Sequence, residues 1–86
     1  MKSILPAKIA KLAERVVAEN IAAGRTIALA ESCTGGLVAS AVTEIPGSSA
    51  VFGSGYVTYS NDAKIKMLGV NEDILDTFGA VSVAVA

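Results

Sequence analysis

Apolar residues recur along residues 6–23 at the spacing of one helical face. The members of this stripe are Ile9, Leu12, Ala13, Val16, Val17 and Ile21. Charged residues lie mostly off the stripe, so the pattern predicts an amphipathic helix that packs its apolar face against a sheet. Gly24 is placed to end this helix, because glycine readily adopts the left-handed conformation found at many helix C-termini.

Two later stretches have the apolar character of strands. Residues 25–30 form a short run that the polar Glu31 ends. Residues 50–60 form a second run with both tyrosines and with Gly53 and Gly55, which indicate a bulge or a close backbone approach. Between the two runs, apolar residues at 37, 38, 41 and 42 recur at helical spacing. The pattern therefore predicts a strand, a helix and a second strand in this order.

A short helix is predicted over residues 63–68, which Asn61 or Asp62 can cap and Gly69 can close. Lys64 then lies in the first turn, where the positive end of the helix disfavours a second positive charge. Together with burial, this field favours a neutral amine that can act as a base. The alternative is a surface lysine that points into water at little cost.

The last predicted helix covers residues 71–78, with Asn71 as its cap and Gly79 after its end. Residues 80–86 have the pattern of a further element, in which Ser82 can cap a helix, but no terminating signal follows. We therefore expect the sequence to be truncated there. Within residues 1–86 no internal boundary is visible, so we expect one domain, or part of one.

Residues 31–36, with the sequence ESCTGG, separate the first predicted strand from the helix that follows. The first turn of a helix leaves backbone N–H groups without partners, and these can stabilise a developing oxyanion. Gly35 and Gly36 let a ligand approach the backbone closely. The turn can therefore present Ser32 as a nucleophile. The alternative is that the glycines only allow a tight turn and that Ser32 or Thr34 caps the helix.

Composition restricts the chemistry that the chain can carry. It has 86 residues, of which 52% are hydrophobic, so a core can form but stability will be modest. The absence of histidine excludes the usual zinc sites and every histidine-based triad, and the single cysteine, Cys33, excludes an intrachain disulfide. We expect no metal and no cofactor.

The charge and hydropathy patterns also bear on partners and location. The net charge is −1, and the chain has only two tyrosines and two phenylalanines to stack on bases, which argues against nucleic-acid binding. No apolar run is long enough to span a bilayer, and the N-terminus lacks a signal-peptide core. We expect a cytoplasmic protein that does not bind membranes.

Four stretches taken together resemble the CinA C-terminal domain, the nicotinamide-nucleotide amidase family also called PncC. They are residues 30–36 (AESCTGG), 45–52 (IPGSSAVF), 57–64 (VTYSNDAK) and 68–70 (LGV). The resemblance implies the α/β class, specifically the N-terminal portion of a three-layer α/β/α domain that continues for roughly as many residues again. The family commonly has Glu-Pro after the serine that corresponds to Ser82, where this chain has Val83 and Ala84.

The resemblance also implies an activity. Members of the family hydrolyse nicotinamide mononucleotide to nicotinate mononucleotide and ammonia, a step in recycling the pyridine ring of NAD. The nucleotide is then the expected small-molecule partner, and we expect a homo-oligomer. Two alternatives remain: a nucleotide-binding domain without catalysis that keeps a phosphate pocket at residues 34–36, and a structural or regulatory domain of the competence-related type.

The family's catalytic set falls on Ser32, Lys64 and Tyr59. Ser32 would attack the carboxamide carbon, and a neutral Lys64 would accept its proton. Tyr59 would relay that proton or orient the amine. Backbone N–H groups of residues 33–36 could hold the oxyanion. A serine–lysine mechanism also fits a chain that has no histidine.

Substrate contacts are expected at two further places. Gly47, Ser48 and Ser49 offer hydroxyl and backbone N–H groups that suit a phosphate, and Thr34 can add a hydroxyl. The alternative for residues 47–49 is a plain turn after Pro46.

Two neighbours of Ser32 have several possible roles. Glu31 could orient Lys64, bind a ribose hydroxyl or simply be solvated beside the turn. Cys33 could be a rival nucleophile, or it could be a small packing residue where no histidine can activate it.

Overall fold

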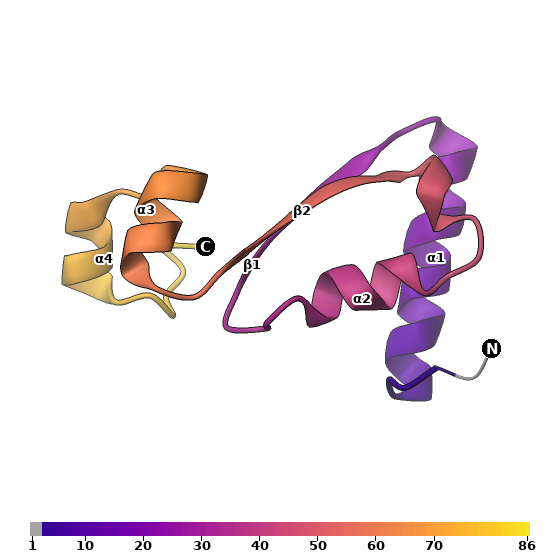
Figure 1. Cartoon of the computed structure of the whole chain (residues 1–86), viewed down its shortest axis with the longest axis horizontal. Coiled ribbons are helices and arrows are strands. Elements are labelled where there is room, and N and C mark those ends of the chain that lie inside the picture. The colour runs from indigo at the N-terminus through magenta and orange to yellow at the C-terminus, as the bar shows by residue number, and fades with distance from the viewer. Residues whose placement is uncertain (1–2) are drawn as a thin grey trace.

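The computed structural model describes residues 3–86 and alternates helices with strands (Figure 1). The elements are α1 (Ala7–Ala23), β1 (Ile27–Ser32), α2 (Leu37–Thr43), the short 3₁₀ helix η1 (Ser48–Ala50), β2 (Phe52–Thr58), α3 (Asn61–Leu68) and α4 (Glu72–Phe78). This is a mixed α/β arrangement, as expected.

The two strands pair in parallel, from Ile27 opposite Phe52 to Ser32 opposite Thr58. Parallel neighbours need a crossover connection, which α2 and η1 provide here. The register slips between Ile27 and Ala28, where Gly53 is the extra residue on β2, so the predicted bulge is confirmed. The parallel register brings the carboxyl ends of both strands to the same end of the sheet.

Strand β1 is displaced from its expected position. The sequence pattern ended it before Glu31, whereas the strand runs through Glu31 and Ser32. A charged residue can remain in a buried strand when its side chain finds partners, and Glu31 finds them in α2.

The hydrophobic core lies where α1 and α2 meet the amino-terminal half of the sheet. Val17, Val42 and Val51 form its centre, and the partly buried residues packed around them are Ile27, Leu29, Ile45 and Phe52. Helix α1 spans the predicted residues and ends at Gly24, which has a φ of 65°. Only part of its apolar stripe is covered, since Ala13 and Val17 are buried while Leu12 is half exposed.

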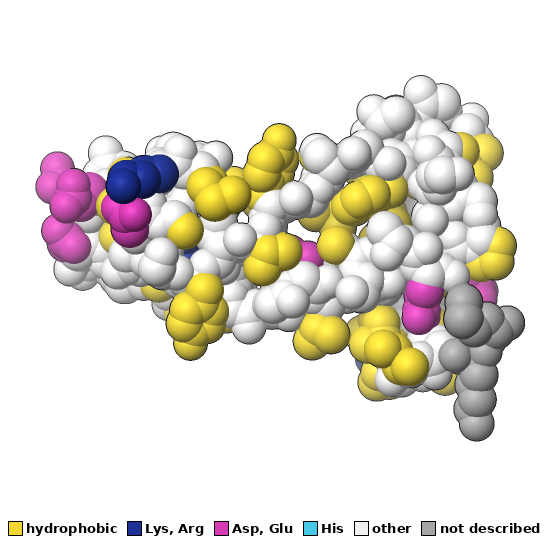
Figure 2. Space-filling model, in the orientation of Figure 1, with side chains coloured by type: hydrophobic (Ala, Val, Ile, Leu, Met, Phe, Trp, Pro, Cys, Tyr) yellow, Lys and Arg dark blue, Asp and Glu magenta, His cyan; other side chains and the backbone are white. Residues whose placement is uncertain are grey.

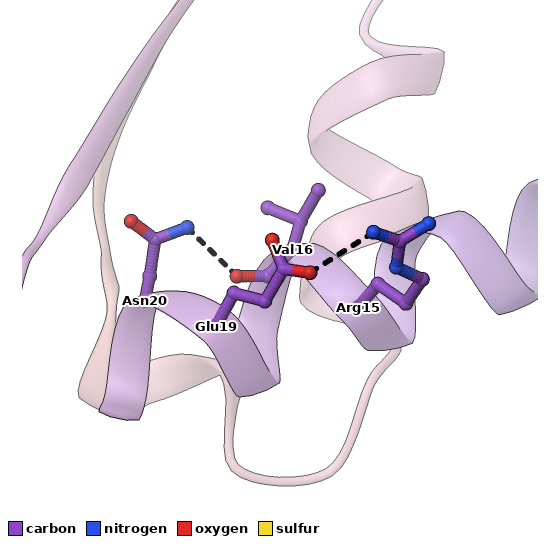
Figure 3. A network of polar contacts seen from close by, with 4 residues as sticks. All are labelled: Arg15, Val16, Glu19 and Asn20. Carbon is purple, nitrogen blue, oxygen red and sulfur yellow. Dashed lines mark hydrogen bonds and ion pairs between the residues drawn. The ribbon is translucent and has the colours of Figure 1, made fainter. Parts of the chain in front are cut away.

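The outer face of α1 carries two local polar contacts (Figure 3). Arg15 Nη2 lies 3.1 Å from Glu19 Oε1, and Asn20 Nδ2 donates to the carbonyl oxygen of Val16 over 2.7 Å. Both residues of the ion pair are largely exposed, so the pair adds little to stability.

Helices α3 and α4 lie beyond the carboxyl ends of the strands, at the opposite end of the molecule from α1 (Figure 1). The molecule is accordingly elongated, with extents of 42 × 27 × 18 Å. The cap of α4 is Asn71, as predicted. The cap of α3 is Ser60, whose Oγ accepts from the Ala63 N–H over 3.1 Å, and not Asn61 or Asp62, because the helical conformation already begins at Asn61.

Apolar side chains remain on the surface along the whole length of the molecule (Figure 2). Among the most exposed are Ile4, Phe78, Val81 and Val83. Residues 80–86 form turns rather than a further helix or strand. Within residues 3–86 the sheet has two strands only, so each strand keeps one unpaired edge. No helix in this part of the chain is both long and apolar enough to cross a bilayer.

Candidate active site

Ser32 and the hydrogen-bond partner of Lys64 both lie at the carboxyl end of the sheet. Ser32 is the last residue of β1, and its register partner is Thr58, the last residue of β2. Lys64 Nζ donates to the carbonyl oxygen of Tyr59, the residue after Thr58, over 2.7 Å. The expected nucleophile therefore lies at the end of β1, and the expected base is bound to the residue that follows the end of β2.

Lys64 is buried, with a relative exposure of 2%. It occupies the first turn of α3, as the sequence predicted, but it does not point into water. The neighbouring Lys66 shows the contrast, because it is exposed and pairs with Asp62 over 3.2 Å. In residues 3–86 the partner of Lys64 Nζ is a carbonyl and no carboxylate lies within ion-pair distance. The alternative of a solvated surface lysine is therefore wrong.

Ser32 and Lys64 are not hydrogen-bonded to each other in the described part of the chain. The Oγ of Ser32 lies 3.6 Å from the Sγ of Cys33. Tyr59 contributes its backbone carbonyl, while its side chain is 80% exposed and makes no hydrogen bond among residues 3–86. The catalytic role of the Tyr59 hydroxyl thus stays a prediction.

The turn after Ser32 is built from left-handed residues. Cys33 has a φ of 74°, Gly35 of 62° and Gly36 of 90°. The conformation suits the glycines but costs a residue with a Cβ about 1–2 kcal/mol. Cys33 is also exposed, so it does not serve as a small packing residue. Backbone strain of this kind is found preferentially where a turn has to present a functional group.

The carboxylate of Glu31 is buried, with a relative exposure of 4%. Its Oε1 accepts from the Thr34 hydroxyl over 2.7 Å and from the Val38 N–H over 3.0 Å. Its Oε2 accepts from the Ala39 N–H over 3.0 Å. Glu31 is therefore not solvated, and its hydrogen bonds go to the start of α2 and not to Lys64.

These bonds decide the charge of Glu31. Burial by itself raises the pKa of this carboxyl, but the hydrogen bonds from Thr34 and from the backbone at the start of α2 outweigh it. The pKa of Glu31 is consequently lowered from its usual 4.5. Glu31 is ionised at neutral pH. The Thr34 hydroxyl donates its hydrogen bond to Glu31, so only its acceptor capacity is left, which does not suit a phosphate.

The residues expected to bind phosphate lie elsewhere. Gly47–Ser49 precede β2, next to the strand end where Phe52 pairs with Ile27. Since each strand residue advances about 3.3 Å, roughly 20 Å of β2 separates them from the end that carries Ser32. Ser48 is buried and its Oγ donates to the Thr43 carbonyl over 3.2 Å, which fits the plain-turn alternative. The structure does not bring these residues to Ser32.

Thr58 is part of the site, although the sequence analysis gave it no role. It is 2% exposed, and its Oγ1 donates to the carbonyl oxygen of Glu31 over 3.0 Å. The available signal was a hydroxyl residue at the end of a predicted strand, directly before the tyrosine and lysine motif. Its hydrogen bond ties the two strand ends together beside Ser32.

Comparisons with known proteins identify the family of this chain. The family model of the CinA C-terminal domain matches residues 9–86. A CinA-like protein from Chlorobium limicola is 57% identical over 72 residues, which cover 84% of this chain and 16% of that protein. Curated relatives of this kind are thus about six times as long as the aligned segment.

Solved structures show the same fold. A competence/damage inducible protein from Agrobacterium tumefaciens is 53% identical, with a TM-score of 0.94, and the match covers 99% of this chain and 52% of that one. A competence-damaged protein (CinA) superfamily protein from Escherichia coli is 35% identical, with a TM-score of 0.87, over 98% of this chain and 50% of that one. This chain spans about half the length of these structures. It belongs to the CinA C-terminal domain family.

Proposed function

We propose that this chain carries the catalytic serine and lysine of an amidase that hydrolyses nicotinamide mononucleotide to nicotinate mononucleotide and ammonia. The observation that supports the proposal is that Ser32 ends β1 while the buried amine of Lys64, from α3, binds the carbonyl of Tyr59, the residue after the paired end of β2. The resemblance of the motifs to the amidase family supplies the substrate. We infer a cytoplasmic reaction that recycles the pyridine ring of NAD.

The chemistry follows from the residues present. Ser32 Oγ attacks the carboxamide carbon, while a neutral Lys64 accepts the hydroxyl proton. The tetrahedral oxyanion takes hydrogen bonds from backbone N–H groups of the turn after Ser32, and losing one such donor typically costs about 10²–10³ in rate. Lys64 returns the proton to the departing nitrogen, which leaves as ammonia, and water then hydrolyses the ester on Ser32.

The amine has to move to perform this role. Lys64 Nζ is bound to the Tyr59 carbonyl, one residue beyond the register partner of Ser32. Rotation of the flexible lysine side chain can exchange that carbonyl for the serine hydroxyl. Catalytic hydrogen bonds are often absent before substrate binds and form only in the complex. We therefore expect the Ser32–Lys64 contact to form with the nucleotide bound.

The same observation supports a second candidate. A lysine held by a backbone carbonyl also fits a domain that binds a nucleotide without hydrolysing it or has a regulatory role.

One experiment separates the candidates. Ammonia release from nicotinamide mononucleotide is measured for residues 1–86 and for a chain extended to the length of the solved relatives, each with and without Ser32→Ala. Turnover that depends on Ser32 supports the amidase. Calorimetric binding without turnover at either length supports the nucleotide-binding domain, and neither binding nor turnover supports the regulatory one.

A further inference from the structure

Glu31 carries the only carboxylate that is buried within residues 3–86. The mechanism above gives it no chemical step, because its oxygens accept hydrogen bonds from Thr34, Val38 and Ala39. Burial of an ionised group is costly unless such bonds compensate it. The arrangement therefore calls for an explanation beyond core packing.

The first part of the explanation concerns α2. Its N-cap position is Gly36, which has no side chain to accept from the free N–H groups of the first turn. The carboxylate of Glu31 accepts from Val38 and Ala39 instead, from a position before the turn. A negative charge at this end also complements the helix dipole. Glu31 thus caps α2 across the turn that contains Ser32.

The second part concerns the backbone of Glu31. The residue is paired with Val57 in the sheet, and its carbonyl oxygen accepts from the buried Thr58 hydroxyl over 3.0 Å. Its backbone is therefore fixed to β2 while its side chain is fixed to α2. The segment between these two anchors contains Ser32, the last residue of β1, and the strained turn that begins at Cys33.

We infer that Glu31 is a positioning residue, which clamps both ends of the turn so that the Ser32 hydroxyl and the N–H groups after it are presented in one geometry. The inference rests on the proposed function for its link to turnover. It also means that the N–H groups of Val38 and Ala39 are unavailable to a substrate anion. The phosphate of the nucleotide then binds elsewhere.

The test compares Glu31→Gln with Glu72→Gln. Glutamine keeps the shape of Glu31 but places an N–H₂ group opposite a backbone donor. Glu72 is an exposed glutamate in the first turn of α4, so its substitution is a control for the loss of a carboxylate at the start of a helix. The probe is phenylmethanesulfonyl fluoride, which sulfonylates activated serines. Modification of Ser32 is followed by mass spectrometry, at a temperature at which circular dichroism shows that each variant is folded.

We expect Ser32 in Glu31→Gln to be labelled at least about 10-fold more slowly than in the wild type, with Glu72→Gln unchanged. In the chain that turns over nicotinamide mononucleotide, kcat should fall while KM stays within about 3-fold. A lower melting temperature with unchanged labelling would overturn the positioning role, as would a wild type whose Ser32 is not labelled. Labelling that depends on Glu31 without any turnover would support the clamp and overturn the amidase proposal, so the two failures are distinguishable.

Discussion

The Nζ of Lys64 lies 2.7 Å from the carbonyl oxygen of Tyr59, so the side chain from α3 reaches back to the strand end that precedes its own helix. A lysine at this position in an ordinary surface helix would extend into water. Here only Tyr59 and Ser60 connect β2 to α3, and Lys64 is buried with its amine bound to the residue that follows Thr58, the register partner of Ser32. Several experiments can test what this contact is for.

Ser32→Ala should abolish ammonia release from nicotinamide mononucleotide in any length of chain that is active. Loss of a serine nucleophile should lower kcat by at least about 10³-fold, whereas the fold should be unaffected because the hydroxyl contacts only Cys33 Sγ within the described residues. The measurement is steady-state kinetics together with thermal unfolding. Ser40→Ala, at an exposed position on α2, is the control and should keep wild-type turnover. Substantial activity in Ser32→Ala would remove Ser32 as the nucleophile.

Lys64→Met should also abolish turnover, because methionine has nearly the same length but no group that accepts a proton. The free energy of unfolding should stay within about 1 kcal/mol of the wild type, since the lost hydrogen bond to the Tyr59 carbonyl is offset by removal of a buried amine. Lys66→Met is the matched control, because Lys66 lies on the same helix but is exposed. If Lys64→Met kept full activity, as is expected of Lys66→Met, Lys64 would not be the base.

Most of the fold was predictable because its local signals agree with one another. The apolar stripe of α1, its end at Gly24 and the Asn71 cap of α4 are each set within a few residues of sequence. The end of β1 was not predictable in this way. Glu31 is polar, so the local pattern indicated that the strand ends before it. The residue remains in β1 because its carboxylate accepts hydrogen bonds from α2, and the local sequence does not reveal a tertiary contact of this kind.

The candidate site shows the same division. The motif and the helix position predict Ser32 and Lys64 as site residues, and the parallel register explains why the ends of β1 and β2 lie side by side. Thr58 was missed, because its hydrogen bond to the Glu31 carbonyl joins residues 27 positions apart. Gly47–Ser49 have small and hydroxyl residues that suit phosphate binding. Their composition does not show that they lie before β2, at the opposite end of the sheet from Ser32.

Cys33 gives a prediction about backbone strain. Its φ of 74° disfavours β-branched residues most, so Cys33→Val should lower the free energy of unfolding by about 1–2 kcal/mol. Cys33→Gly should retain both turnover and stability, because glycine adopts this conformation without strain. Chemical denaturation measures the first effect, and ammonia release the second. If Cys33→Gly were folded but inactive, the result would favour Cys33 over Ser32 as the nucleophile.

The last prediction concerns the pH dependence of stability. The pKa of Glu31 is lowered in the folded protein, so the carboxylate stabilises the folded state at pH values above its usual 4.5. This contribution should be lost as the pH falls below 4.5 through the lower folded pKa, because the protonated carboxyl is a weaker acceptor for the N–H groups of α2. Glutamine does not titrate, so Glu31→Gln should lack this part of the pH dependence.

The two proteins should therefore differ most near neutral pH, where Glu31→Gln should be less stable by about 1–3 kcal/mol, and the difference should shrink as the pH falls toward 3. Urea unfolding at a series of pH values measures it. Titration of the other carboxyls affects both proteins alike and cancels in the comparison. A difference between wild type and Glu31→Gln that stayed constant across this range would mean that the charge of Glu31 does not hold the start of α2.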